Sequence, residues 1–365
     1  MSLPPPSYNA LGHTRRVVGH IQREIAACGG WISFARFMEL ALYAPGLGYY
    51  SAGSAKLGVE GDFVTAPEIS PYFGRTLARP IADSLRQVAG SVLELGAGSG
   101  RLALDLLTEL QRSDSLPAQY MILEVSADLR ERQRLLFRQH APQFLDRLAW
   151  LDQLPASFVG VVLANEVLDA LPVHILHWRD QDVFERGVIS AGASFAWEER
   201  ALATCALRDH ALQLAPPGEY LSEVSVAVPA LVRSIGAMLE RGAAFFIDYG
   251  FLRAEFYHPQ RSRGTLMCHY RHHAHDDPFY LPGLQDITAH VDFTTVAQAA
   301  SEAGLQVTRY ASQAKFLIDS GITELLAALD PRDTAAYLPV ANQVQRLLSP
   351  AEMGELFKVM VLNAG

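Results

Sequence analysis

The chain has 365 residues, half of them hydrophobic, and 39 acidic against 30 basic side chains give a formal net charge of −9. This length suits one large domain with insertions or two domains, and the composition excludes a disordered chain. An acidic chain lacks the basic surface that nucleic-acid phosphates require, so a nucleic-acid-binding protein is not expected. No run of about 18 apolar residues occurs, so we expect no membrane span.

The N-terminal part is expected to form helices and a loop. Residues 12–45 carry a helical pattern that is interrupted at Gly29 and Gly30. The punctuated segment 61–70 precedes a helix expected over 71–88. A surface loop and a loop folded over an active site both fit this segment, and its aromatic and acidic content favours the second. The residues expected to cover the active site are Tyr50, Asp62, Phe63, Pro67 and Glu68.

Further along, short apolar strands alternate with helices. The expected strands are 91–95, 120–125, 148–151, 159–164, 243–250, 305–311 and 357–362. The expected helices begin at residue 101 and then span 127–139, 225–240, 293–304 and, as one helical segment, 323–348. This alternation predicts an α/β fold with a doubly wound parallel sheet.

Two segments depart from the alternation. Residues 174–198 have a period of two, which predicts an antiparallel meander inserted into the sheet. Residues 252–292 are expected to be a long irregular insertion. We therefore expect an N-terminal segment over 1–88 and a doubly wound domain over 89–365, with insertions at about 174–222 and 252–292.

A glycine-rich turn follows the first of these strands. Gly96 lies two residues after Glu94, Gly98 and Gly100 follow at alternate positions, and a helix begins after them, as in nucleotide-binding turns. A dinucleotide fingerprint would need its third glycine at Arg101, which argues against an NAD-dependent oxidoreductase. The spacing acid-x-Gly-x-Gly-x-Gly is instead similar to the first motif of class I S-adenosylmethionine-dependent methyltransferases. That resemblance places Glu94 near the cofactor's ammonium group.

Further acids stand at strand ends, where open α/β sheets bind their ligands. Glu124 ends an apolar run and can accept hydrogen bonds from two ribose hydroxyls, or act as a helix-capping or surface acid. Asp152 follows the next strand at a position where such enzymes often contact adenine.

Another strand delivers Asn165 and Glu166 to the same edge, with Asp169 three residues beyond Glu166. Buried acids beside a sulfonium need a cationic partner, and a planar guanidinium matches carboxylates. We expect Asn165 at the cofactor and Glu166 and Asp169 as catalytic groups, although Asp169 can equally be a capping or loop acid.

Four histidines crowd residues 269–275, and three cysteines lie far apart at Cys28, Cys205 and Cys268. Neither set has a familiar metal-site spacing, so no metal is expected. A loop that faces a partner or substrate is the preferred interpretation of the histidines, and reduced, packed thiols that of the cysteines.

Several ordered blocks resemble MidA-type methyltransferases, a family that includes the mitochondrial complex I assembly factor 7 methyltransferases and their bacterial relatives. The resemblance covers about residues 14–362. The blocks are residues 61–70, 93–100, 123–126, 165–173, 247–250, 264–266, 286–293 and 353–359. Some relatives have proline where Ala97 stands here.

The resemblance implies a class I core that binds S-adenosylmethionine, with Gly96, Gly98, Gly100 and Glu124 at the cofactor and residues 166–169 beside methyl transfer. In the mitochondrial branch it also implies symmetric dimethylation of an arginine in a respiratory-complex subunit. We expect a cytoplasmic enzyme, because no targeting segment is seen, that methylates arginine in a protein partner. An assembly factor without turnover, a different substrate and a homodimer stay open.

Overall fold

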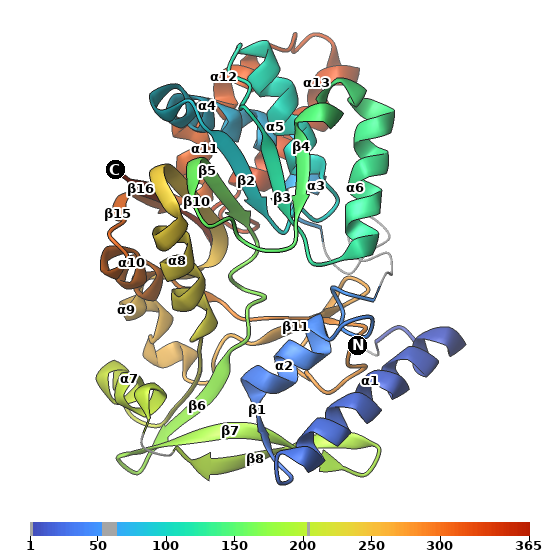
Figure 1. Cartoon of the computed structure of the whole chain (residues 1–365), viewed down its shortest axis with the longest axis vertical. Helices are drawn as coiled ribbons and strands as arrows, with labels where there is room; N and C mark the ends of the chain where they lie inside the picture. The colour runs from blue at the N-terminus through green and yellow to red at the C-terminus, as the bar shows by residue number, and fades with distance from the viewer. Residues whose placement is uncertain (1–2, 53–63, 203–204) are drawn as a thin grey trace.

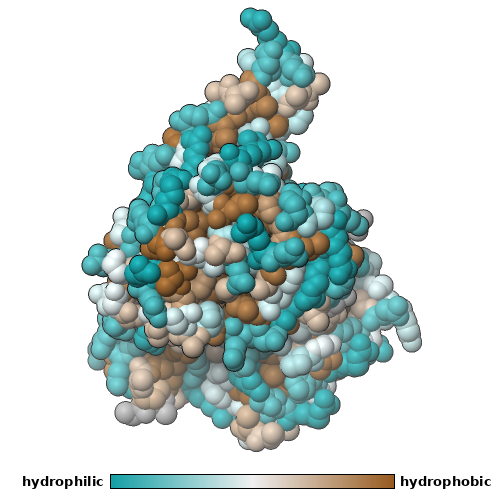
Figure 2. All heavy atoms as spheres, turned by 45° about the horizontal axis from the view of Figure 1, so that its top comes forward, coloured by the Kyte–Doolittle hydropathy of each residue, from teal (hydrophilic) through white to brown (hydrophobic). Residues whose placement is uncertain are grey.

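The computed structural model describes residues 3–52, 64–202 and 205–365. In Figure 1 a central sheet with its helices forms the upper part, while the N-terminal helices and a second sheet form the lower part. Hydrophilic residues are spread over the face shown in Figure 2, with hydrophobic residues exposed between them. In the described part of the chain, no helix is long and apolar enough to cross a membrane.

The central sheet has eight strands. Its order is β15 (Gln306–Ser312), β16 (Phe357–Ala364), β10 (Leu239–Phe251), β5 (Phe158–Asn165), β2 (Ser91–Leu95), β3 (Tyr120–Leu123) and β4 (Leu148–Leu151), and the short β14 (Val291–Asp292) pairs with β10. Strands β10, β5, β2, β3 and β4 pair in parallel, while β16 runs antiparallel to both β10 and β15. The predicted doubly wound α/β sheet is confirmed, with one reversed strand near its edge.

Helices cover both faces of this sheet. One face carries α4 (Pro71–Val88), α5 (Arg101–Arg112), α6 (Ala127–His140), α11 (Gln313–Asp319), α12 (Ile322–Ala327) and α13 (Thr334–Leu348), with the 3-10 helix η1 (Pro142–Arg147) after α6. The other face carries α8 (Ala227–Met238) and α10 (Phe293–Glu302). These two layers leave the carboxyl ends of the parallel strands at one edge, where ligands of such sheets bind.

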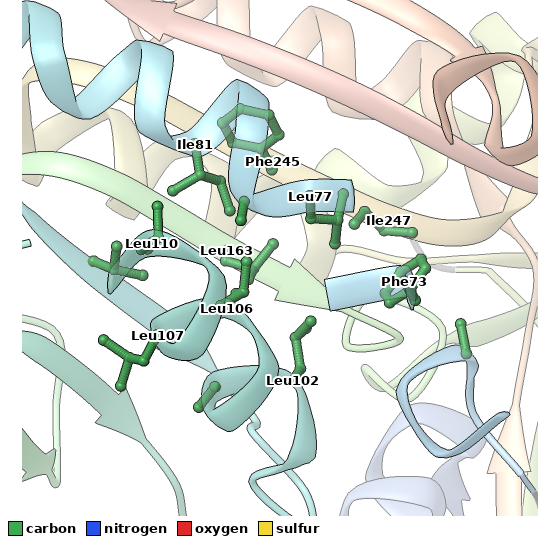
Figure 3. Packing of buried hydrophobic residues seen from close by; sticks show 14 of the residues in the cluster. Phe73, Leu77, Ile81, Leu102, Leu106, Leu107, Leu110, Leu163, Phe245 and Ile247 are labelled. Carbon is green, nitrogen blue, oxygen red and sulfur yellow. The ribbon is translucent and has the colours of Figure 1, made fainter. Parts of the chain in front are cut away.

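The larger core lies between α4, α5 and the sheet. In Figure 3, Phe73 and Leu77 of α4 and Leu106 of α5 lie around Leu163 of β5 and Ile247 of β10, in the same cluster. All five side chains are buried. Because both faces of the central strands are covered, their sequences are continuous apolar runs rather than alternating ones.

The predicted antiparallel meander is confirmed, but it lies in a separate sheet and not in the central sheet, where it was expected. The strands are β1 (Ile32–Ser33), β7 (Asp182–Ala191), β6 (His174–Arg179) and β9 (Tyr220–Val224), with β8 (Ser194–Ala201) paired to β7. All of these pairs are antiparallel. One apolar face packs against α1 (Tyr8–Ala27) and α2 (Phe34–Tyr43), and the other against α7 (Ala206–Leu214). The meander has its own core, and β1 adds an N-terminal strand to it.

The insertion over residues 252–292 is irregular only in part. This insertion contains α9 (Arg253–Phe256), the 3-10 helix η2 (Pro259–Arg261) and a sheet of β12 (His273–His275), β11 (Met267–Tyr270) and β13 (Asp286–Thr288). The Thr14 hydroxyl of α1 donates to the Pro282 carbonyl at 2.9 Å. The strands are only three or four residues long, so their pairing with each other, not their sequence pattern, decides their structure.

Helix boundaries follow local chemistry. The expected start of a helix after Ser70 is confirmed, because the Ser70 hydroxyl accepts a hydrogen bond from the Tyr72 amide at 3.2 Å. The segment expected as one helix over 323–348 is divided into α12 and α13. Pro331 lies between them, and a residue that precedes proline disfavours helical geometry. The domain boundary near residue 88 stays a prediction.

Candidate cofactor and substrate site

A cavity of about 300 Å³ lies at the carboxyl ends of β2, β3 and β5. The sequence-predicted residues that line it are Tyr50, Pro67, Glu68, Glu94, Gly96, Gly98, Glu124, Asn165 and Glu166. Gly100, Asp152 and Asp169 do not line it, and Asp62 and Phe63 lie outside the described residues. The alternation of strands and helices brings most predicted residues together, because parallel strands end at one edge of a sheet.

The glycine turn presents backbone to this cavity. Gly96 and Gly98 have φ of +61° and +54°, a conformation that side chains with a Cβ rarely adopt. The Gly96 amide donates to the Leu123 carbonyl at 2.9 Å, which ties the turn to the neighbouring strand end. A Cβ on Gly100 would lie 3.1 Å from the Gln133 side chain of α6. Gly100 therefore permits close helix packing, while Gly96 and Gly98 line the cavity.

Glu94 and Glu124 form one wall of the cavity. The Tyr120 hydroxyl donates to Glu94 Oε2 at 2.7 Å, and the Ser126 amide donates to Glu124 Oε1 at 2.9 Å. Burial raises the pKa of Glu94 to about 7, although the Tyr120 hydrogen bond lowers it. Burial also raises the pKa of Glu124. A carboxylate has about four acceptor positions, so both groups keep capacity for donors of a ligand.

Glu166 is held in an uncommon backbone conformation beside the cavity. Its φ is +53°, and its amide donates to the Ile247 carbonyl at 2.8 Å. The Asn165 side-chain amide donates to Glu166 Oε1 at 3.1 Å, and the Ala66 amide at the start of α3 (Ala66–Ile69) also donates to this carboxyl. Burial and the nearby Asp169 raise the pKa of Glu166 to about 8. Such strained residues tend to occur at functional sites.

Asp248 fixes the turn that carries Glu166. Its Oδ2 accepts from the amides of Val167, Leu168 and Asp169 at 3.2, 2.8 and 3.3 Å. Asp248 is buried on β10, next to β5. The sequence showed a second buried strand that ends in an acid, but did not show that this acid holds the turn of its neighbour.

Asp169 lies behind Glu166 rather than in the cavity. Its carboxyl is buried, accepts a hydrogen bond from Tyr249, and burial raises its pKa to about 6. Its Oδ1 has no hydrogen-bond partner among the described residues. Its expected direct catalytic role stays a prediction. Its position lets its charge raise the pKa of Glu166 without contact with a ligand in the cavity.

Another wall of the cavity comes from the N-terminal part of the chain. Tyr43, Tyr50, Thr65, Pro67 and Glu68 line it. Glu68 accepts a hydrogen bond from the Ser99 hydroxyl of the glycine turn, so α3 is tied to that turn. Sequence reasoning missed Tyr43; its one signal is an aromatic residue at a helix end shortly before Tyr50.

Two other predicted features lie away from the cavity. The Asp152 side chain is 89 % exposed and pairs with Arg130 at 2.7 Å. His269 lies on β11, and His273 and His275 lie on β12. Across the described ranges, no group of three or more His, Cys, Asp or Glu side chains could hold a metal ion.

The charge of the cavity is one-sided. Four carboxyl side chains line it, those of Glu68, Glu94, Glu124 and Glu166, and the described lining residues include no lysine, arginine or histidine. Buried carboxylates are stabilised by a cationic partner, so the cavity suits ligands that carry positive charge.

A family model described as "Putative S-adenosyl-L-methionine-dependent methyltransferase" matches residues 76–311, well over half of the chain. The chain belongs to this family. The methyltransferase resemblance of the sequence is thereby confirmed, and the chain is an S-adenosylmethionine-dependent methyltransferase rather than an NAD-dependent oxidoreductase.

Individual relatives agree over nearly the whole length. The Drosophila melanogaster protein named "Protein arginine methyltransferase NDUFAF7 homolog, mitochondrial" is 30% identical, with 100% of this chain and 90% of the relative covered. The Danio rerio protein arginine methyltransferase NDUFAF7 is 29% identical, with 96% and 87% covered. A crystal structure of a Burkholderia thailandensis protein bound to S-adenosyl-homocysteine is 48% identical with a TM-score of 0.96, covering 99% of this chain and 95% of that one.

The residues present fit S-adenosylmethionine. Gly96 and Gly98 offer open backbone, Glu94 can accept from the ammonium group, and Glu124 can accept from ribose hydroxyls. Asn165 Oδ1 is buried without a partner among the described residues, so it offers another acceptor beside the site.

Proposed function

We propose that this methyltransferase modifies the guanidinium group of arginine in a protein substrate. The observation that carries the proposal is the cavity's charge, with four glutamates and no basic side chain among the described lining residues. S-adenosylmethionine contributes two positive groups and one negative group, so its net charge does not balance the four carboxyls in their ionised form. A second cation beside it would improve that balance.

The relatives support this choice of cation. The proteins from Drosophila melanogaster and Danio rerio are both named as protein arginine methyltransferases. A guanidinium is planar, carries five N–H donors and matches a carboxylate with two parallel hydrogen bonds. A substrate arginine on a flexible chain segment could reach the half-buried Glu166 through the cavity that Glu166 lines.

Within this proposal the glutamates have different roles. Glu94 and Glu124 hold the cofactor's ammonium and ribose groups, and Glu166 orients the guanidinium. When bound, S-adenosylmethionine supplies an electrophilic methyl group on sulfur. Glu166 in its carboxylate form accepts N–H bonds from the guanidinium and can take the proton that the attacking nitrogen gives up. Asp248 keeps the Glu166 turn in place, so alignment comes from a fixed backbone.

Finer expectations belong to the same proposal. A respiratory-complex subunit is one candidate partner, because the mitochondrial branch of the family suggests it. A cytoplasmic location and a homodimer stay predictions.

The test is methyl labelling of a lysate from cells that lack this protein. Purified full-length protein and methyl-labelled cofactor are added, and modified residues are identified by mass spectrometry. We expect labelled arginine with the wild type and its loss with Glu166→Gln, while the exposed Glu198→Gln variant serves as the matched control.

Labels on another residue type would contradict the arginine proposal while leaving the methyltransferase in place. Binding of S-adenosylhomocysteine with no labelling of any protein would favour an assembly factor without turnover. Equal labelling by wild type and Glu166→Gln would remove Glu166 from the chemistry.

A further inference from the structure

One wall of the cavity is aromatic and comes from a short N-terminal segment. Tyr43 ends α2 and Tyr50 lies seven residues later, and their rings stack with centroids 5.4 Å apart and planes at 26°. Both rings line the cavity that also contains Glu166. Tyr49, which is buried, packs edge-on against Tyr50 at 5.0 Å. The pair is therefore supported from behind rather than free to rotate.

The hydroxyl groups of this pair are already used as donors. Tyr43 Oη donates to the Ala170 carbonyl at 2.9 Å, and Tyr50 Oη donates to Asp286 Oδ1 at 2.8 Å. Ala170 follows the Glu166 turn, and Asp286 lies on β13 of the second insertion. Each ring is thus fixed at its far end by a different segment. A ligand in the cavity meets mainly ring carbon surface from these two residues, not a hydroxyl donor.

Acidic groups surround this ring surface. Glu166 lines the same cavity, and Asp169 and Asp286 are close enough to raise the pKa values of both Tyr43 and Glu166. A ring face beside carboxylates suits a cation. A guanidinium is weakly hydrated and stacks on aromatic faces, whereas an ammonium group is strongly hydrated and needs three acceptors around it. The wall supplies flat surface and few acceptors, so it suits the guanidinium better.

We propose that Tyr43 and Tyr50 form a guanidinium-selective wall that distinguishes arginine from lysine in the substrate site. This proposal rests on the proposed function and names the residues that determine its specificity. Glu166 supplies the charge that attracts either cation. The stacked rings supply the contact that only the planar cation uses fully.

The test measures binding, so it needs no identified protein substrate. Full-length protein saturated with S-adenosylhomocysteine is titrated by calorimetry with n-butylguanidinium and, separately, with n-pentylammonium. We expect the guanidinium to bind the wild type at least about tenfold more tightly than the ammonium. Tyr43→Leu and Tyr50→Leu should each weaken guanidinium binding by about three- to thirtyfold, the range of a cation–π contact.

Two further variants separate the ring from the hydroxyl and from general effects. Tyr43→Phe and Tyr50→Phe keep the ring and should bind guanidinium within about threefold of the wild type. Tyr8→Leu changes a tyrosine that is 87% exposed on α1 and should leave binding unchanged. S-adenosylhomocysteine binding reports whether each variant is folded.

Leucine variants that bind S-adenosylhomocysteine and retain full guanidinium affinity would overturn the wall. If those variants do not fold, two other results would overturn the wall. One is a similar affinity of the wild type for the two cations, and the other is loss of guanidinium binding in the phenylalanine variants. If arginine is labelled in the lysate but the leucine variants bind guanidinium as the wild type does, the aromatic wall is contradicted and the proposed function stands. Labelling of a residue other than arginine would remove the proposed function itself.

Discussion

Two glutamates of this chain, the half-buried Glu166 and the buried Glu223, differ most in their partners. Glu223 accepts from the Thr265 amide at 3.0 and 2.9 Å, from the Thr265 hydroxyl at 3.0 Å and from the Leu266 amide at 3.0 Å. Glu223 joins β9 to the second insertion, so its role is structural. Glu166 has fewer donors and a left-handed backbone, and it lines the cavity. The pKa of both is raised by burial.

The difference shows that burial of an acid does not by itself mark a functional site. Unused acceptor capacity beside a cavity is a better mark of a functional site. A buried acceptor without donors lowers the stability of the fold, so it is retained for another reason. The Glu223 carboxyl is already satisfied by backbone and side-chain donors, so its chemistry is complete within the fold.

The largest expected effect is at the glycine turn. Gly98→Val should abolish S-adenosylhomocysteine binding at millimolar ligand, because a branched side chain would enter the cavity at a backbone φ of +54°. The matched control is Gly192→Val, which has a φ of +61° in a turn with no atom within 4 Å of the added Cβ. Both variants should lose about 1–2 kcal/mol of unfolding free energy. Only Gly98→Val should lose S-adenosylhomocysteine binding. Equal binding by the two variants would contradict the assignment of Gly98 to the cofactor site.

Stability should separate the two glutamates. Glu223→Ala leaves the Thr265 and Leu266 donors unpaired and should lower the free energy of unfolding by about 2–4 kcal/mol, measured by urea denaturation. At pH 5, where the Glu166 carboxyl is protonated, Glu166→Gln should change it by less than about 1 kcal/mol, because a neutral amide replaces a neutral acid. The contrast fails if Glu166→Gln proves the more destabilising of the two.

Asp248 should affect methyl transfer more than cofactor binding. Asp248→Asn replaces the carboxylate that holds three amides of the Glu166 turn, so labelling of lysate proteins should fall by about 10- to 100-fold. S-adenosylhomocysteine affinity should stay within about threefold, because Asp248 does not line the cavity. The exposed Asp276→Asn variant is the control. A parallel loss of binding and labelling would mean that Asp248 supports the whole site.

The pH dependence of stability should also identify Glu166. Its folded-state pKa, about 8, is raised above the ordinary 4.5. A raised pKa stabilises the folded state fully below the ordinary value, and this contribution is lost as pH rises through the folded value. The Tm of the ligand-free wild type should therefore fall relative to Glu166→Gln by about 5 °C between pH 5 and 8, measured by calorimetry. Parallel curves for the two proteins would argue against a raised pKa at Glu166.

The smallest effect is expected at Asp152. Asp152→Ala removes an exposed ion pair and should change the unfolding free energy by less than about 1 kcal/mol. It should leave S-adenosylhomocysteine affinity within about twofold, because the side chain points to solvent rather than into the cavity. For comparison, Glu124→Gln should weaken S-adenosylhomocysteine affinity by about tenfold. A large loss of S-adenosylhomocysteine affinity in Asp152→Ala would support the adenine contact that the sequence position of Asp152 suggests.

The sequence by itself determined the parallel sheet, the glycine turn and the acids Glu94, Glu124 and Glu166. Hydrophobic period fixes where strands end, and parallel strands end at one edge, so these residues meet whatever surrounds them. Only the tertiary structure decided that the meander forms its own sheet and that Asp248 holds its neighbour's turn. It also decided the aromatic wall, because Tyr50 meets Asp286 across 236 positions of the chain. Such contacts depend on packing between distant segments, which no local pattern specifies.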